Sequence, residues 1–265
     1  MMETLRRLVR GRSLVGVLAR RELKARYRGS ALGFLWSLLN PLLLLAIYSA
    51  VFTLVFAPRG ATIHPYALFL FGGVLAWNFV SGSLLDAAQT FRANGPLLRK
   101  VIVNPEIFPG VSVVSQGMHF LLALPVLLAA TAVSVFAFSG RFGWTALQLV
   151  PIGLLLATAV LGGALLVSAA SVRFQDLRDL LQSLLTFWFF ATPIIYSLDS
   201  LPAAVRRWAR LNPATAFFVG IHDALFDDRW VGAPDWAAMA IVAAASLALG
   251  ASVFSRLRES IAEEA

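Results

Sequence analysis

Long uncharged stretches alternate with short polar segments along most of this chain. Six stretches are apolar enough for membrane-spanning helices, which need about 20 predominantly apolar residues each. They cover residues 33–56, 66–90, 108–138, 145–171, 180–198 and 237–255. The third and fourth exceed this length, so we expect them to tilt, to bend at Pro125 or Pro151, or to extend beyond the bilayer. The pattern predicts an all-α integral membrane protein with six transmembrane helices.

The longest connection between predicted spans, residues 199–236, is only partly polar. It opens with "DSLPAAVRRWARLNP" and continues with "ATAFFVGIHDALF", an apolar run of 13 residues. Runs of this length are more typical of interfacial or re-entrant segments than of spans. We expect two short re-entrant helices, interrupted at Asn212-Pro213, between spans five and six. A short seventh span is the alternative, and it would move the C-terminus to the other side.

Small residues recur at helical spacing in the fourth and sixth predicted spans. Ala159 and Gly163 are four residues apart in the fourth span, and Ala244, Ala248 and Ser252 repeat this spacing in the sixth. Small residues allow helix backbones to approach closely inside a membrane. This spacing of small residues predicts close packing of these helices but does not specify which spans pack together.

The composition supports the membrane prediction. The chain has 265 residues, of which 59% are hydrophobic and 14% charged, whereas soluble domains carry about 25% charged residues. The absence of cysteine excludes disulfides and thiolate chemistry. Residues 1–28 hold nine cations and two acids, a net +7 of the total +8, which leaves +1 for the rest of the chain. This concentration is typical of a topology signal beside a membrane span and argues against a nucleic-acid partner.

The cations also predict the orientation. Six spans place both termini on one side, where 16 of the 22 cations then lie, against six on the other side. The positive-inside rule therefore predicts cytoplasmic termini. A cleaved signal peptide is not expected, because its apolar region has about 7–15 residues whereas Gly33–Phe56 contains 24 uncharged residues.

The basic N-terminal block, residues 1–28, precedes a membrane domain predicted over residues 29–265. The block predicts an amphipathic helix that lies on the inner membrane surface. Its apolar face would hold Leu14, Leu18 and Ala25, and its basic face would hold Arg20, Lys24 and Arg28. The alternative is a disordered segment that serves only as a topology signal.

Two further inner connections are candidates for a docking surface. In "FRANGPLLRKVIVNPEIFP", residues 91–109, Asn94-Gly95-Pro96 predicts a turn, and "LLRKVIV" predicts a short helix that ends before Asn104-Pro105. The second, "VRFQDLRDL", residues 172–180, crowds four charges into a short loop. Either segment could be an ordinary loop, but both lie on the side predicted for the amphipathic helix.

The fifth predicted span is unusually aromatic. Its segment "LLTFWFFATPIIYSLDSLP", residues 184–202, also contains Pro193, which should break the helix near its outer end. Aromatic rings stack on the apolar faces of sugars, but they also pack between helices or face lipid. The sequence leaves pore lining and packing open.

Recognisable catalytic chemistry is absent from the sequence. It contains no phosphate-binding G-x-x-x-x-G-K-[ST], H-E-x-x-H, G-x-S-x-G or G-x-G-x-x-G motif. The three histidines lack metal-ligand spacing. His119 lies mid-span, one turn after Gln116, and fits a neutral hydrogen-bonded histidine as well as a functional site. We therefore expect no enzyme activity, metal or cofactor in this chain.

Five segments together resemble a known family. They are "RELKARYRGSALGFLWSLLNPLL", "GPLLRKVIVNPEIFP", "VRFQDLRDLL", "FFATPIIYSLDSLP" and "LNPATAFF". In this order, over roughly residues 15–255, the chain resembles the membrane permeases of ABC-type polysaccharide exporters, which export O-antigen, teichoic acid or capsule. "NPEIFP" departs from the family, where a Phe-Pro-Arg type of sequence is expected, because Glu106 stands in this segment.

The resemblance implies a role for each segment. The chain would be half of a homodimer in the bacterial cytoplasmic membrane, and two copies of a separate ATPase subunit would bind ATP and Mg²⁺. Residues 3–28 would form a gate helix, residues 94–105 a coupling helix and residues 173–179 a second ATPase contact. The implied ATPase-coupling residues are Leu97, Leu98, Arg99, Lys100, Val101, Arg173, Asp176, Arg178 and Asp179.

The resemblance also implies a channel between the two copies, lined by their first and fifth spans and closed outside by the segments in 199–236. The implied channel-lining residues are Tyr48, Phe52, Phe187, Trp188, Phe190 and Tyr196. The favoured function is export of a lipid-linked polysaccharide, with O-antigen first. Export of drugs or small hydrophobic molecules is one alternative. A membrane-embedded transferase is another, although it requires convergent carboxylates or histidines that the sequence does not show.

Overall fold

The computed structural model describes residues 2–26, 29–30, 32–51, 66–100, 104–137, 144–174 and 176–264. Within these ranges all regular structure is helical and no strand occurs, which confirms the all-α class. The α-helices are α1 (Met2–Arg10), α2 (Arg12–Arg26), α3 (Trp36–Ala50), α4 (Tyr66–Lys100), α5 (Ile107–Ala137), α6 (Leu149–Ser171), α7 (Leu177–Ala191), α8 (Ala203–Ala209), α9 (Thr215–Leu225) and α10 (Ala233–Glu264). Short 3-10 turns are η1 (Gly33–Leu35), η3 (Trp144–Gln148) and η4 (Leu198–Ser200).

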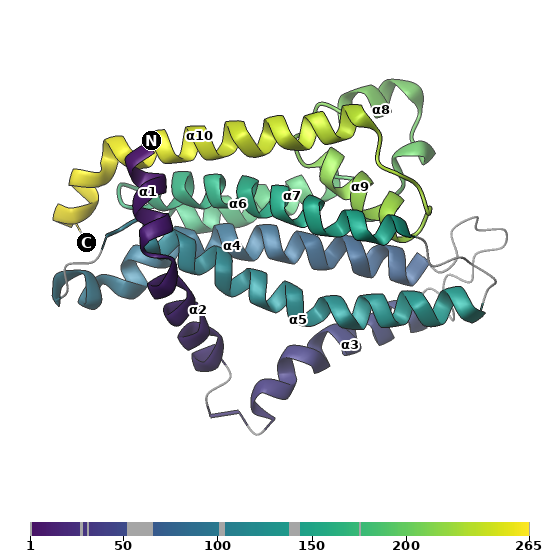
Figure 1. Cartoon of the computed structure of the whole chain (residues 1–265), viewed down its shortest axis with the longest axis horizontal. Coiled ribbons are helices and arrows are strands. Elements are labelled where there is room, and N and C mark those ends of the chain that lie inside the picture. Colours follow the sequence, from purple (N-terminus) through teal and green to yellow (C-terminus); the bar gives the residue numbers. More distant parts are fainter. Residues whose placement is uncertain are drawn as a thin grey trace.

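Four long helices, α4, α5, α6 and α10, run side by side along the molecule (Figure 1). Each is long and apolar enough to cross a membrane, and they coincide with the second, third, fourth and sixth predicted spans. The first predicted span corresponds to the 15-residue α3, and its residues 52–56 lie outside the described ranges. The fifth corresponds to α7, also 15 residues long. Four of the six predicted spans are therefore confirmed as long apolar helices.

Helix α4 is the centre of the bundle. In its most apolar stretch of 18 residues, 78% of the residues are buried, against 22–33% in the corresponding stretches of the other three long helices. It contacts α3, α5, α6, α7 and α9. The largest fully buried side chains around it include Phe71, Ile152, Phe217, Phe218 and Met239. Burial of these side chains on all sides of one helix fixes the positions of the surrounding helices.

Helices α6 and α10 make a backbone-to-backbone contact through glycine. A Cβ atom on Gly162 would lie 2.3 Å from the carbonyl carbon of Ser246, and one on Gly250 would lie 2.0 Å from the Gly162 oxygen. The Ser246 hydroxyl donates a hydrogen bond to the Ala159 carbonyl at 2.7 Å. The predicted close packing thus joins spans four and six, but Gly162 makes the contact, and the predicted Gly163 faces α4 instead.

The N-terminal segment forms two helices, α1 and α2, which meet at Gly11, whereas one continuous helix was predicted. A residue larger than glycine would be crowded at position 11, because a Cβ atom there would lie 2.9 Å from Ile107 Cδ1. Of the predicted apolar face, Leu18 is partly buried beside Val15 and Ala19, which pack against α5, whereas Leu14 and Ala25 are exposed. Helix α1 lies against α10 near both chain termini (Figure 1).

The connection from α7 to α10 contains the two short predicted helices, α8 and α9. Helix α8 has no buried residue, whereas nine of the 11 residues of α9 are buried. Both lie at the end of the bundle opposite the termini (Figure 1). The predicted interruption at Asn212-Pro213 is confirmed, since these residues lie between α8 and α9.

Candidate functional site

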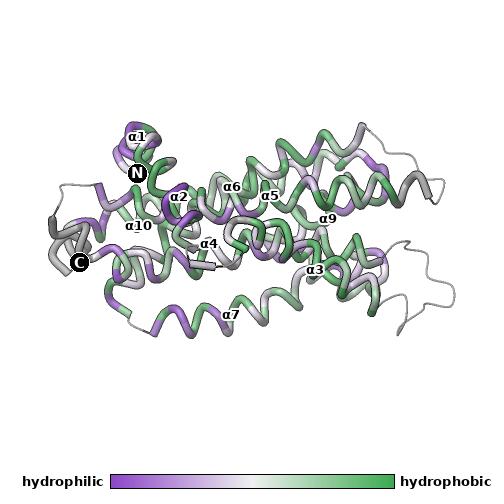
Figure 2. Tube along the Cα trace, turned by 90° about the horizontal axis from the view of Figure 1, so that it is seen from below, coloured by the Kyte–Doolittle hydropathy of each residue, from purple (hydrophilic) through white to green (hydrophobic). Residues whose placement is uncertain are grey.

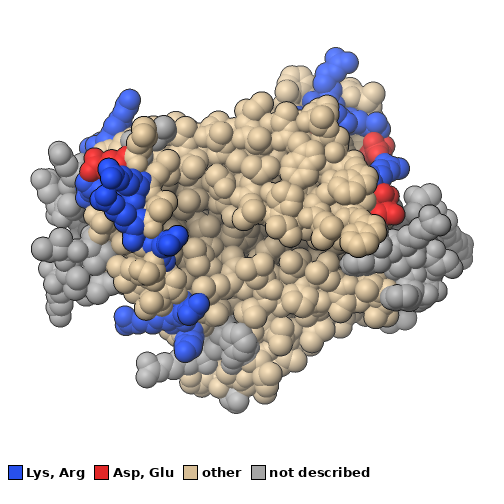
Figure 3. Space-filling model, viewed as in Figure 1, with Lys and Arg blue, Asp and Glu red and all other residues tan. Residues whose placement is uncertain are grey.

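Several predicted functional segments gather at one end of the bundle, which we call the terminal end. It comprises residues 2–10, 96–100, 104–106, 172–174, 176–179 and 255–264, and both termini lie there (Figure 1). Lys and Arg side chains cluster at this end, and a broad uncharged face separates them from the charges at the opposite end (Figure 3). This distribution is typical of a bundle that crosses a bilayer between two charged surfaces.

The described part of the predicted coupling segment, residues 94–100, continues helix α4. Helix α4 runs without a break through Asn94-Gly95-Pro96 to Lys100, so the predicted turn at these residues is wrong. The Asn94 side chain donates to the Thr90 carbonyl at 2.9 Å, which is a bond within the helix. Local turn propensity is thus overridden by continuation of the long buried helix. The backbone of Leu97, Leu98, Arg99 and Lys100 forms its last turn, and Val101 lies outside the described residues.

The second predicted contact segment lies between α6 and the start of α7. Arg173, Asp176, Arg178 and Asp179 are all exposed. The Arg178 guanidinium lies against the side-chain amide of Gln89, whose oxygen accepts from it when the amide is oriented to suit. Because Gln89 belongs to α4, this contact brings the loop beside the α4 segment that leads to residues 97–100. The two predicted ATPase contacts therefore lie at the same end.

A buried carboxylate, Glu106, joins three elements at the terminal end. Its side chain is 1% exposed and lies 3.3 Å from Arg258 Nε on α10 and 3.9 Å from Arg7 Nη1 on α1. Burial raises the pKa of Glu106, and the charge of Arg7 opposes that rise. Sequence reasoning noted this residue only as a departure from the family. The signal that could have identified its role is an isolated acid directly before an apolar span.

The predicted gate-helix cations face away from the bundle. Arg20 and Lys24 on α2 are exposed, and Arg28 lies outside the described residues. The opposite face of α2 packs Val15 and Ala19 against α5. The cations are thus available to a membrane surface or a partner, while the apolar face holds the helix in place.

The aromatic residues of α7 point in different directions. Phe187 is 74% exposed and Phe190 60% exposed. Trp188 turns inward, where its indole packs edge-on against Trp77 at 5.7 Å. Figure 2 shows α7 at the edge of the bundle, hydrophilic at its start and hydrophobic towards its end. Of the predicted channel residues on this helix, two therefore lie on an open face and Trp188 lies in a packed interface.

Asn212, in the predicted helix break, anchors α7 to the α8–α9 connection. Its Oδ1 accepts from Trp188 Nε1 at 2.8 Å and from the Ala214 backbone N–H at 3.0 Å. Its Nδ2 donates to the Ala191 carbonyl at 3.1 Å and to the Thr192 hydroxyl at 2.9 Å. Sequence reasoning identified Asn212-Pro213 only as a break and missed this role, because the four partners are known only once the segments are folded together.

Three predicted channel residues remain. The Tyr196 hydroxyl donates to the Phe190 carbonyl at 3.2 Å, which ties the segment after α7 back to that helix. Tyr48 on α3 is partly buried against the core, and Phe52 lies outside the described residues. Among the described channel residues, Tyr48 and Trp188 thus pack against the core, whereas Phe187 and Phe190 are exposed.

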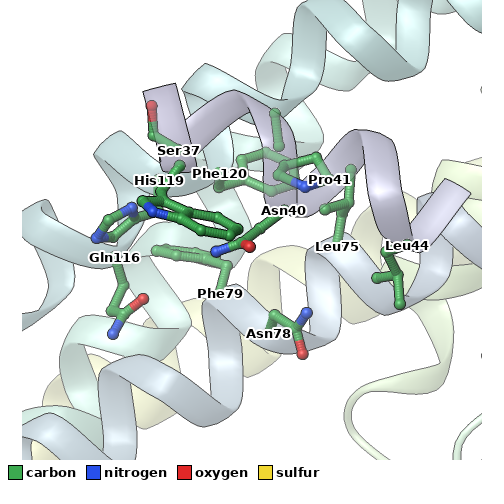
Figure 4. Close-up of a pocket in the computed structure, with 12 residues that line it drawn as sticks. Ser37, Asn40, Pro41, Leu44, Leu75, Asn78, Phe79, Gln116, His119 and Phe120 are labelled. Atoms are coloured by element: carbon green, nitrogen blue, oxygen red, sulfur yellow. The ribbon is translucent and has the colours of Figure 1, made fainter. Parts of the chain in front are cut away.

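A cavity of about 500 Å³ lies between α3, α4 and α5 (Figure 4). Its walls combine polar and aromatic side chains: Trp36, Ser37, Asn40, Asn78, Phe79, Gln116, His119 and Phe120. The cavity thus contains both residues, Gln116 and His119, that the sequence singled out on the third span. Gln116 Nε2 donates to Asp86 Oδ2 at 2.5 Å, so this pair is part of a polar contact between α4 and α5.

No metal centre is formed by the residues that the structure describes, since they contain no group of three or more His, Asp or Glu side chains placed to hold an ion. At the end opposite the termini, Asp199 pairs with Arg206 at 3.6 Å and with Arg229 at 4.0 Å. These pairs connect the exposed loops around α8.

Comparison with known proteins gives consistent matches along the chain. The family model described as ABC-2 type transporter matches residues 13–226. An O-antigen export system permease protein, RfbA, from Myxococcus xanthus is 33% identical over 265 residues, which is 99% of both chains. Two proteins of the same name from Klebsiella pneumoniae are 28% and 27% identical, each over 94% of both chains.

Proposed function

This chain belongs to the ABC-2 type transporter family, and from that premise we propose that it is the permease subunit of an ATP-driven exporter of O-antigen. The observation that carries the proposal is its likeness, along essentially its whole length, to permeases named for O-antigen export. A separate ATPase would supply the energy, since the sequence contains no phosphate-binding loop of its own.

We infer that ATPase subunits bind the terminal end. Four exposed charged residues, Arg173, Asp176, Arg178 and Asp179, offer a polar contact surface beside the last turn of α4. The charge count supports a cytoplasmic position for this end in the bacterial inner membrane, because most of the cations lie on that side. ATP and Mg²⁺ would be held by two ATPase copies.

A homodimer would form the channel, with six spans in each copy. Helices α3 and α7 would be the first and fifth spans, and both contact α4. The exposed rings of Phe187 and Phe190 support a role for this face of α7 in the channel or its wall. Helices α8 and α9, at the opposite end from the ATPase contacts, would form the outer closure.

Closure of the ATPase dimer would act on the permease through rigid helices. The end of α4 continues directly into the bundle centre, so a displacement at Lys100 is carried along one helix. Glu106 would couple α1, α5 and α10 in the same movement through its two arginine partners. Rearrangement of packed helices between two states is the usual form of such gating.

The test is reconstitution with a candidate ABC ATPase subunit from the same organism. The purified complex in lipid nanodiscs should hydrolyse ATP faster when lipid-linked O-polysaccharide is added. A complex whose ATPase lacks its catalytic glutamate serves as the control for background hydrolysis. Stimulation by small hydrophobic drugs, with none by the glycolipid, would favour the drug-export alternative and contradict the proposal.

A further inference from the structure

We propose that the cavity between α3, α4 and α5 binds an uncharged, hydroxyl-rich sugar unit. The inference rests on the proposed function, because it assigns a saccharide site to a chain proposed to export a glycan. It adds a ligand site inside each copy, separate from the exposed rings of α7.

The cavity lies at membrane depth. His119 is 12 residues beyond Ile107, where α5 begins, which corresponds to about 18 Å along the helix. The hydrocarbon core of a bilayer is about 30 Å thick, so a helix that crosses it carries this residue well inside. A polar cavity at that depth needs a physical explanation, because polar groups in spanning segments are costly.

Two amide side chains in the cavity have no internal partner. Asn40 on α3 and Asn78 on α4 are exposed, and neither forms a hydrogen bond within the ranges that the structure describes. Other polar side chains on the same helices are satisfied internally: the Ser81 and Ser83 hydroxyls donate to the carbonyls of Trp77 and Phe79. An unbonded amide in an apolar medium is unfavourable. Asn40 and Asn78 therefore require a polar occupant.

The lining favours a neutral saccharide over an ion. None of the 12 residues that line the cavity is Lys, Arg, Asp or Glu, so nothing there compensates the charge of a phosphate. Asp86, which accepts a hydrogen bond from Gln116, is the acid next to the lining and likewise offers no cation to a phosphate. Amides bond sugar hydroxyls, and aromatic rings cover the apolar face of a sugar ring.

Most of the polar side chains of the cavity lie towards one end, although Asn78 lies nearer the leucines (Figure 4). Ser37, Gln116 and His119 lie towards one end, and Leu44 and Leu75 lie towards the other, with Asn40 above Phe79 between them (Figure 4). The polar end is nearer the beginnings of α3 and α5. This arrangement suits a ligand with a hydroxyl-rich head and an apolar tail, such as a sugar attached to an alkyl chain.

The absence of cysteine makes a site-specific test possible. Leu44→Cys places a thiol in the cavity wall, and Leu43→Cys places the control thiol on the neighbouring, half-exposed face of α3. The rate of thiol modification by a small methanethiosulfonate reagent is measured on the permease–ATPase complex in nanodiscs. The probes are dodecyl maltoside below its micelle-forming concentration, dodecyl phosphate and dodecanol, which share one alkyl chain.

We expect dodecyl maltoside alone to slow modification of Leu44→Cys, with no effect of any probe on Leu43→Cys. Adding Asn40→Leu or Asn78→Leu should raise the maltoside concentration needed for half protection by about threefold to tenfold, the effect of losing a neutral hydrogen bond. Ser81→Ala, which removes a hydroxyl bonded within its own helix, is the matched control and should leave protection unchanged.

Equal protection by dodecyl phosphate or dodecanol would overturn the inference, because the cavity would then accept any amphiphile. Absence of protection by the maltoside, or protection that is insensitive to both asparagine substitutions, would also overturn it. In each of these cases, stimulation of the wild-type complex by lipid-linked O-polysaccharide would show that the proposed function stands without this site. Selective protection in a complex that the glycolipid does not stimulate would instead contradict the proposed function alone.

Discussion

At the scale of single residues, two polar side chains connect segments that lie far apart in the sequence. Asn212 uses both atoms of its amide to join α7 to the start of α9. Glu106 joins the first, fifth and last α-helices at the other end of the molecule. Both residues were visible in the sequence as features of a loop. Their roles depend on partners up to about 150 positions away, which no local pattern specifies.

Replacing Asn212 should loosen the α8–α9 end. Asn212→Ala removes four hydrogen bonds and leaves the Trp188 indole N–H without its acceptor, so we expect the free energy of unfolding to fall by about 2–3 kcal/mol. Asn212→Asp keeps the acceptor for Trp188, so its free energy of unfolding should fall by less. Thermal unfolding in detergent, followed by tryptophan fluorescence, measures both. Equal stability of wild type and Asn212→Ala would contradict the assigned role.

The buried carboxylate at the terminal end should make stability depend on pH. Burial raises the pKa of Glu106 above its ordinary value of 4.5, so the folded state binds the proton more tightly than the unfolded state. The contribution of this carboxyl to stability is therefore greatest below pH 4.5 and is lost as pH rises through the raised pKa. Glu106→Gln cannot titrate, so its melting temperature should rise relative to wild type over that window.

A control for this pH profile is Asp179→Asn, which removes an exposed carboxylate from the same end of the molecule. Its melting temperature should run parallel to that of the wild type. If Glu106→Gln instead loses stability relative to wild type as pH rises, attraction by Arg7 and Arg258 outweighs burial, and the direction of the pKa shift is wrong.

At the scale of helices, the long apolar runs predicted the helices better than local turn-forming residues predicted where they end. The long apolar runs correctly predicted α4, α5, α6 and α10. Asn94-Gly95-Pro96 was expected to end α4, but the helix continues past it, because a tertiary context can override local turn propensity. The contact of Val15 and Ala19 with α5 was not predicted from the N-terminal sequence, although Leu18 of the predicted apolar face lies beside it. Short segments carry too few apolar positions for their periodicity to identify the partner helix.

The contact between α6 and α10 provides a test at this scale. Gly162→Ala places a Cβ atom against the backbone of α10 at 2.3 Å, so the two helices must separate and we expect a loss of about 1–3 kcal/mol. Gly153→Ala on the same helix meets nothing within 4 Å and should be neutral or slightly stabilising. Unfolding in detergent by increasing SDS compares the two. Equal tolerance would show that α6 and α10 are not held at this distance.

The two faces of α7 should respond differently to truncation. Trp188→Ala removes a partly buried indole and its bond to Asn212, and should lower stability by about 2–4 kcal/mol. Phe187→Ala and Phe190→Ala remove exposed rings and should leave thermal stability nearly unchanged while reducing export of O-antigen. Surface polysaccharide in cells and the melting temperature of the purified protein separate these effects. Normal export by both phenylalanine variants would indicate that these rings face lipid.

At the scale of the whole molecule, the two ends differ in chemistry and in the segments they contain. The terminal end carries the α4 extension and the 172–179 loop, and the other end carries α8 and α9. The sequence predicted this division from charge alone. It could not predict the cavity between α3, α4 and α5, because the cavity depends on how far α3 stands from the two longer helices.

Charge reversal at the two ends tests which end receives the ATPase. Arg173→Glu alters an exposed residue of the loop between α6 and α7, and Arg207→Glu alters an exposed residue of α8 as a matched control. Because a charge reversed at an interface repels its former partner, Arg173→Glu should weaken ATPase binding by about tenfold, and with it ATP-dependent export, without affecting membrane insertion. Arg207→Glu should leave ATPase binding unchanged. Co-purification of the tagged permease with its ATPase measures both. Loss of binding in Arg207→Glu but not in Arg173→Glu would invert the assignment, place the ATPase against α8, and require the termini on the outer side.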